Sequence, residues 1–261
     1  MDQRIYVFLV VGFLMFSLGC LDDGGTKLSV EEIVTNSETA MNSLDSYALD
    51  MDLLISGENP QSPEAGEMAI RLESSSKLDI MNKRMYTSGT MDMEGMSMPM
   101  ETYIIGNMQY SKAPMAGWVK QEAEMSWDDL AEAGKISMVG NANLTLEGGE
   151  VVDGVDCYVI TTVPTAETIL KIFSQEIGGS GSMGDAKSFL ESVKSMTSKE
   201  WISKSDFRLR KTHITVDLES EGSPISVEIT MRVYDFNEPM NIKLSEEAKN
   251  ARDMSPMGGR I

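Results

Sequence analysis

Methionine is the residue type whose number and spacing suggest a binding role in this sequence. The chain has 22 methionines among 261 residues, and seven of them fall within one stretch of 25 residues. Strand alternation places Met91 and Met93 on one face, and places Met96, Met98 and Met100 together on one face of the next strand. Unbranched, polarisable thioethers repack around ligands of varied shape, so these five side chains are our candidate wall of a hydrophobic site.

Two alternatives for these methionines remain open. The side chains can simply fill a hydrophobic core. Closely spaced thioethers also suit monovalent copper, which would make the chain a Met-based copper-binding protein. No His or Cys lies nearby to complete a firm site, so we predict no metal ligands here. Trp118 and Trp201 are further candidates to line an apolar cavity, and both are equally suited to a plain core.

Residues that commonly carry catalysis are scarce. His213 is the only histidine, and alternation places it on the solvated face of a strand. Without a second histidine, no Ser/His/Asp or Cys/His arrangement can be assembled, and a zinc site lacks ligands. The 41 acidic residues offer many carboxylate pairs, but no spacing singles one out. We therefore predict a protein that is not an enzyme, with no catalytic residue and no cofactor.

The net charge limits the partners. Lys and Arg number 22 against 41 Asp and Glu, which gives a formal charge of -19. Such a surface repels phosphate backbones and anionic head groups. We therefore expect no nucleic-acid partner.

The N-terminus has the pattern of a lipoprotein signal peptide. An almost unbroken apolar run from Ile5 to Phe16 precedes Ser17-Leu18-Gly19-Cys20, which resembles a lipobox. Residues 5–18 would span roughly 21 Å as a helix, well short of the roughly 30 Å hydrocarbon core. The sequence predicts cleavage after residue 19 and a lipid on Cys20, followed by a polar tether over residues 20–28.

This anchor would hold the protein on a membrane, facing the extracytoplasmic side at the cell surface or in the periplasm. The alternatives are an ordinary secretory signal or an uncleaved anchor, in which Cys20 is incidental. If Cys20 carries lipid, Cys157 is the one remaining thiol and has no disulfide partner within the chain. An exported fold must then rest on its hydrophobic core.

Most of the remaining chain shows the period-two alternation of strands. Ser29 to Glu32 form a capping box that predicts a helix over residues 30–44, and strand alternation then begins at Tyr47. Asp153-Gly154 predicts a tight hairpin turn. Strand patterns fill most of residues 68–122, 144–163 and 201–233. Further helices are predicted at residues 126–133, 165–173, 186–196 and 245–252.

These elements predict an α+β fold for residues 29–244. Most strands carry one apolar face, and the helices carry apolar stripes that can cover it. The expected architecture is a strongly curved antiparallel β-sheet, or half-barrel, with helices packed on its concave face. Residues 245–261 are expected to form a C-terminal helix and a loose tail.

Several short motifs fall in an order that resembles the LolA and LppX-like lipoprotein superfamily. They span nearly the whole chain after the tether: residues 40–47 (AMNSLDSY), 82–86 (NKRMY), 117–120 (GWVK), 153–158 (DGVDCY), 200–204 (EWISK) and 237–242 (NEPMNI). The resemblance implies an incomplete β-barrel closed by helices around a hydrophobic cavity for lipid or acyl chains. LolA itself is a soluble carrier, so the predicted tether favours the anchored relatives.

The leading hypothesis is a membrane-anchored lipoprotein that binds a lipid or another apolar ligand between sheet and helices. The alternative from a different class is a ligand-free structural or interaction module of the cell envelope, with a protein partner. Asn143-Leu144-Thr145 also fits a glycosylation sequon, which makes Asn143 a predicted attachment site.

Overall fold

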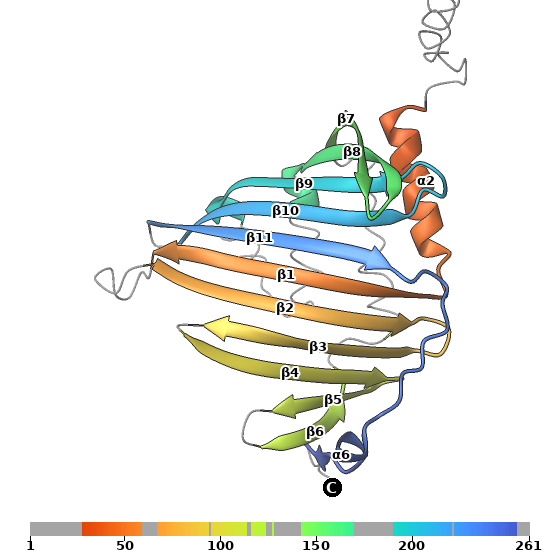
Figure 1. Ribbon diagram of the computed structural model, residues 1–261. Coiled ribbons are helices and arrows are strands. Elements are labelled where there is room, and N and C mark those ends of the chain that lie inside the picture. The colour runs from red at the N-terminus through yellow and green to blue at the C-terminus, as the bar shows by residue number, and fades with distance from the viewer. Residues whose placement is uncertain are drawn as a thin grey trace, which may run out of the picture.

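A computed structural model describes residues 28–58, 67–93, 95–113, 116–123, 127, 142–169, 190–220 and 222–254. Its centre is one twelve-stranded sheet with the order β12-β6-β5-β4-β3-β2-β1-β11-β10-β9-β8-β7 (Figure 1). The strands are β1 (Ser46–Glu58), β2 (Glu67–Asp79), β3 (Arg84–Met93), β4 (Met96–Ile105), β5 (Met108–Ala113), β6 (Gly117–Glu122), β7 (Ala142–Val152), β8 (Val155–Pro164), β9 (Val193–Ser203), β10 (Leu209–Ser220), β11 (Ser223–Tyr234) and β12 (Arg252–Asp253).

Two meanders of consecutive hairpins meet in the middle of this sheet. One runs from β1 to β6 and the other from β7 to β11, and they join where β1 pairs antiparallel with β11. Leu53 faces Ile229 across this junction, 176 residues further along the chain. The two halves therefore form one continuous sheet.

The register gives the sheet two chemically different faces, because successive residues of a strand point to opposite sides. On β1, Leu53 and Ile55 point one way, and Asp50 and Asp52 point the other way. We call the face that carries Leu53 the apolar face, and the face that carries Asp52 the charged face.

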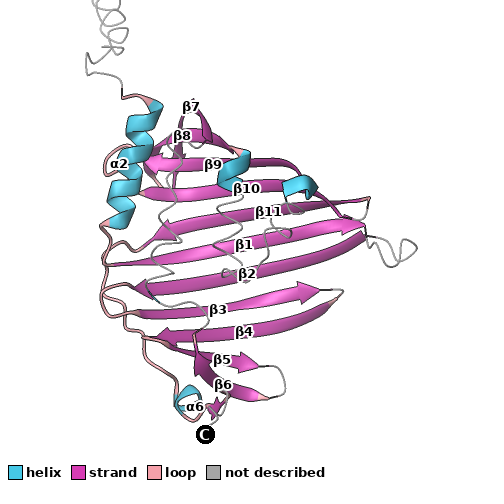
Figure 2. Cartoon of the chain, turned by 180° about the vertical axis from the view of Figure 1, so that it is seen from behind, coloured by secondary structure: helices cyan, strands magenta, loops and turns pink. Residues whose placement is uncertain are grey.

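Helix α2 (Val30–Asn42) covers one end of the apolar face, across the ends of the strands (Figure 2). Ser29 and Glu32 form the predicted capping box, with the Ser29 amide 2.7 Å from a Glu32 carboxylate oxygen. Ile33 and Val34 of α2 pack against Ile160 of β8 and Ile202 of β9, and all four are almost fully buried. This cluster is the core that holds the helix on the sheet.

A second core lies on the charged face at the β4 to β6 end. Tyr103 packs between Tyr86 and Trp118, with ring centroids 4.6 and 5.5 Å apart. The C-terminal segment closes this cluster with Ile242 and with Ala248 of α6 (Glu246–Lys249). Strand β12 then pairs parallel with β6. Residues 246–253, which the sequence sets apart from the sheet domain, thus contribute to its packing and to its edge.

The β7–β8 hairpin turns where the sequence predicts it. Asp153 and Gly154 both adopt positive φ, at 49° and 80°, which is the geometry of a two-residue hairpin turn. Beside it, Cys157, Val159 and Trp201 form a third buried cluster on the charged face.

The fold is mostly β rather than α+β. The antiparallel sheet is confirmed, but it is not strongly curled (Figure 1), and the described residues contain few and short helices. The helix predicted over residues 186–196 is wrong at its end, because Val193 to Met196 begin β9. This stretch becomes a strand because it pairs with β10, while the pairing of β9 with β8 begins only at Ser198.

Several predictions fall outside the described residues. These are the signal peptide, Cys20, most of the tether, most of the helix predicted at 126–133, the start of the helix predicted at 186 and most of the C-terminal tail. The helix predicted at 165–173 is present over residues 166–169, and its end lies outside the described residues. Within the described part of the chain, no helix is both long enough and apolar enough to cross a bilayer.

Candidate functional site

The five candidate methionines do share one face of the sheet. Met91 of β3 lies opposite Met98 of β4, and Met93 lies opposite Met96. Met100 lies one step along the same face, opposite Gly89. The structure therefore brings these five side chains together on the apolar face.

The methionines are one end of a larger apolar surface. Two adjacent rows of side chains cross six neighbouring strands, from β10 through β11, β1, β2 and β3 to β4. We call them the apolar rows. The first consists of Ile214, Ile229, Leu53, Leu72, Met91 and Met98, and the second of Val216, Val227, Ile55, Ile70, Met93 and Met96.

The apolar rows are only partly covered. Eleven of the twelve side chains are half-buried, and Met96 is 56% exposed. None of them belongs to the three core clusters, whereas Ile160 and Ile202 on the same face are fully buried beneath α2. Burying the remaining apolar area would be favourable by about 25 cal/mol per Å². This surface can therefore bind an apolar molecule or segment.

A half-buried polar group lies next to the apolar rows. Glu200 of β9 points to the apolar face, between Ile160 on β8 and Thr212 on β10. The Ser198 hydroxyl lies 3.4 Å from a Glu200 carboxylate oxygen. Burial, and to a lesser degree the nearby Glu38 carboxylate of α2, raises the pKa of Glu200 to about 7.

Glu200 does not stand out in the sequence, because the start of β9 also fits the pattern of a helix. The usable signal was the alternation of β9 itself. When the strand is taken to begin at Val193, Glu200 lies an even number of residues after Met196, so both side chains point to the apolar face.

The two candidate tryptophans lie on the other side of the sheet. Trp118 is paired with Lys112, and Trp201 with Lys211, which places both rings on the charged face. Trp118 is 8% exposed and Trp201 is 6% exposed, each inside its own core cluster. The structure does not bring them together with the methionines.

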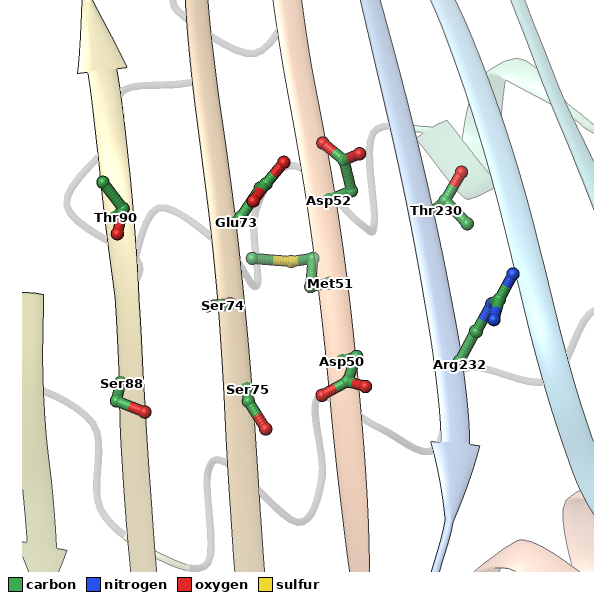
Figure 3. A pocket seen from close by; sticks show the side chains of 10 residues that line it. All are labelled: Asp50, Met51, Asp52, Glu73, Ser74, Ser75, Ser88, Thr90, Thr230 and Arg232. Atoms are coloured by element: carbon green, nitrogen blue, oxygen red, sulfur yellow. The ribbon is translucent and has the colours of Figure 1, made fainter. Parts of the chain in front are cut away.

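The charged face has a polar hollow of its own, with a volume of about 550 Å³. Figure 3 shows Asp50, Asp52, Glu73 and Arg232 around it, from the central strands β1, β2 and β11. Its charges are largely satisfied, because Arg71 contacts Asp52 at 2.7 Å and Glu73 at 2.9 Å. The Tyr234 hydroxyl donates to Asp50 at 2.9 Å. We interpret this hollow as a compensated, solvated surface.

The described residues offer no group of three or more His, Cys, Asp or Glu side chains that could hold a metal ion. His213 lies on the charged face, with its Nδ1 atom 3.0 Å from the Thr230 hydroxyl. Cys157 is fully buried, and burial raises the pKa of its thiol. Asn143 is exposed on the edge strand β7.

Solved structures similar to this chain include those of a lipoprotein and of a LolA superfamily protein. LppX from Mycobacterium tuberculosis is 15% identical, with 84% of this chain and 100% of that chain covered and a TM-score of 0.46. LprF from Mycobacterium bovis is 12% identical, with 82% and 96% covered and a TM-score of 0.48. A LolA superfamily protein from Nitrosomonas europaea is 11% identical, with 78% and 93% covered and a TM-score of 0.24.

The resemblance predicted from the motifs is thus confirmed as a structural similarity to LppX, LprF and LolA superfamily proteins. The chain belongs to a family of unknown function (DUF6612), whose model matches residues 29–253. No curated protein matches the chain.

Proposed function

We propose that this protein is a membrane-anchored, extracytoplasmic lipoprotein that binds a lipid or another hydrophobic ligand on the apolar face of its sheet. The observation that carries the proposal is the pair of apolar rows. Twelve apolar side chains from six strands form one continuous surface, and most of them stay half-buried. Monomeric proteins seldom leave a contiguous apolar surface of this kind without a binding partner.

The side-chain chemistry of this surface favours a ligand that varies in shape. Branched aliphatic side chains occupy β10, β11 and β1, while Met91, Met93, Met96 and Met98 occupy β3 and β4. The aliphatic end is stiff and the thioether end adapts by changing rotamers. Such a surface suits flexible acyl chains better than one rigid ring system.

The anchor in this proposal is the predicted lipid on Cys20. It would be supplied by the lipobox-like Ser17-Leu18-Gly19-Cys20 and followed by a polar tether. A lipid chain on Cys20 would hold the binding domain close to the membrane surface, where apolar ligands are available. Radiolabelled palmitate incorporation that is lost in Cys20→Ser and kept in Cys157→Ser would support this part of the proposal.

The binding surface is tested by native mass spectrometry of gently purified protein, followed by titration with a fluorescent fatty acid. Leu53 and Leu54 are a matched pair, since both are half-buried leucines of β1 and they point to opposite faces. We expect Leu53→Ser to weaken lipid binding about tenfold, and we expect Leu54→Ser to leave binding unchanged. Equal effects of the two substitutions, or a clean ligand-free mass with no lipid uptake, would favour the envelope interaction module instead.

One geometric observation favours copper as a second candidate ligand. Met91 and Met98, and likewise Met93 and Met96, face each other across two strands, and directly opposed side chains have Cβ atoms about 5 Å apart. Titration with monovalent copper, before and after changing Met93, Met96 and Met98 to Leu, tests this candidate. Affinity that is unchanged by the three substitutions would dismiss it.

A further inference from the structure

The apolar rows end beside a polar group that is costly to keep there. Ser198 continues the first apolar row onto β9, where it lies opposite Ile214, and Glu200 is the next residue of the same face. A carboxylate in such surroundings loses most of its hydration, and it is retained only where something compensates its charge.

The surroundings of Glu200 are polar but hold no described cation. The Ser198 hydroxyl donates a hydrogen bond to Glu200, and no Lys or Arg forms an ion pair with Glu200 within the described part of the chain. Glu38 approaches from α2 and adds a second negative charge. The residues opposite Glu200 on the two neighbouring strands, Ile160 and Thr212, are uncharged.

An unpartnered hydroxyl lies at the same place. Thr162 lies directly opposite Ser198 on the apolar face and is only 1% exposed. Its Oγ1 atom has no hydrogen-bond partner among the described residues. Buried polar atoms are normally paired, so this hydroxyl offers an unused hydrogen-bonding atom close to the Glu200 carboxylate.

We propose that Glu200, with Thr162 and Ser198, receives the cationic head of an amphiphile whose apolar chain lies along the apolar rows. The inference rests on the proposed function, because it names the head group of a ligand bound to that same surface. An ammonium head supplies the positive charge that Glu200 lacks and the hydrogen-bond donors that carboxylate and hydroxyl oxygens accept.

The dimensions agree with this arrangement. From β9 to β4 the sheet has six strand spacings of about 4.8 Å, so the surface from Glu200 to Met98 extends roughly 29 Å. One acyl chain reaches about half of the roughly 30 Å hydrocarbon core of a bilayer. The apolar rows therefore accommodate the full length of one chain and leave room for a second.

Three probes with one tail and different heads test the proposal on the full chain, purified in a non-ionic detergent. Oleylamine, oleyl alcohol and oleate would each compete with a neutral fluorescent probe at pH 8. We expect oleylamine to bind about tenfold more tightly than oleyl alcohol, and oleate to bind most weakly. Glu200→Gln should remove the preference for the amine and leave the alcohol unchanged. Glu228→Gln, on the charged face of β11, is the matched control.

The pH dependence of oleylamine binding to the unmodified chain is a second test. A purely structural role of Glu200 would leave this pH dependence flat. Because burial raises the pKa of Glu200 to about 7, its negative charge develops as the pH rises from 6 to 8. Oleylamine affinity should therefore increase over this range, while oleyl alcohol affinity stays flat. Glu200→Gln should flatten the amine profile.

The outcomes separate this inference from the proposed function. If all three probes bind equally and Glu200→Gln changes none of them, the head-group inference is wrong while the apolar surface still binds lipid. If no probe binds, or if Leu53→Ser and Leu54→Ser behave alike, the proposed function itself fails. An amine preference that survives in Glu200→Gln would also overturn the inference.

Discussion

The two faces of the sheet show how differently one set of strands can be used. On the charged face, polar groups find partners within the protein, as Arg71 does with Asp52 and Glu73. On the apolar face, twelve apolar side chains remain half-covered and Glu200 lacks a described cation. The charged face satisfies most of its own groups, whereas the apolar face is left incomplete on both apolar and polar counts, and this difference is the basis of the proposed ligand binding.

The largest loss of stability should come from a substitution in the part of the apolar face that lies buried beneath α2. Ile202→Ala removes a fully buried side chain beneath α2 and should lower the free energy of unfolding by about 3 to 4 kcal/mol. Ile229→Ala, in the half-buried first apolar row, should cost only about 1 kcal/mol. Urea denaturation of both variants measures the difference, and equal losses would mean that the apolar rows are packed as core.

Glu200→Gln should stabilise the protein at high pH. The carboxyl titrates at about 7 in the folded state against an ordinary value of 4.5, so the native state loses stability as the pH rises through this window. At pH 8 the substitution should add up to about 3 kcal/mol to the free energy of unfolding, and near pH 4 it should add nothing. A pH-independent difference in urea denaturation between variant and parent would contradict the raised pKa of Glu200.

The helix that covers one end of the apolar face should be sensitive to its cap. Ser29→Ala removes the hydroxyl that accepts a hydrogen bond from the Glu32 amide, and this should lower the free energy of unfolding by about 1 kcal/mol. Ser29→Asp, which restores an acceptor, should recover most of the loss. Thermal unfolding followed by circular dichroism measures both, and a loss in Ser29→Asp as large as in Ser29→Ala would argue against the capping box.

The smallest effect is expected on the charged face. Arg71→Met breaks the bridges to Asp52 and Glu73, but these groups are well exposed and solvated. We expect no measurable change in melting temperature or in fatty-acid binding. A clear loss of binding in this variant would mean that the charged face takes part in ligand recognition.

Much of the sheet could be predicted from the sequence because alternation is a strong local signal. The prediction that the methionines of β3 and β4 share one face of the sheet is correct, since the alternation of apolar and polar residues is clear on both sides of the turn at Gly95. The sequence left open whether Trp118 and Trp201 line a cavity or belong to a core, because aromatic character alone does not say which cluster a ring joins, and the structure places both in core clusters on the charged face. The turn at Asp153 and Gly154 is predicted correctly, since few residue types readily adopt the positive φ angles that a two-residue hairpin turn requires.

Long-range pairing is what the local signals could not provide. The stretch Val193 to Met196 is compatible with a helix, and its pairing with β10 makes it the start of β9. Glu200 is therefore not apparent from the sequence. Once β9 is known to begin at Val193, strand alternation places Glu200 on the apolar face. The degree of curvature also depends on how all the strands pack together, so the strongly curved half-barrel was not a safe inference from alternation.

The junction of β1 with β11 has a consequence for how the protein reaches its native state. The first strand of the chain cannot complete its pairing until the strand Ser223–Tyr234, whose residues lie 168 to 186 positions after their partners, is available. Until then β1 keeps an unpaired edge, which invites pairing with other chains. Contacts of such sequence separation also slow folding, so a chaperone that shields this edge should raise the yield of native protein.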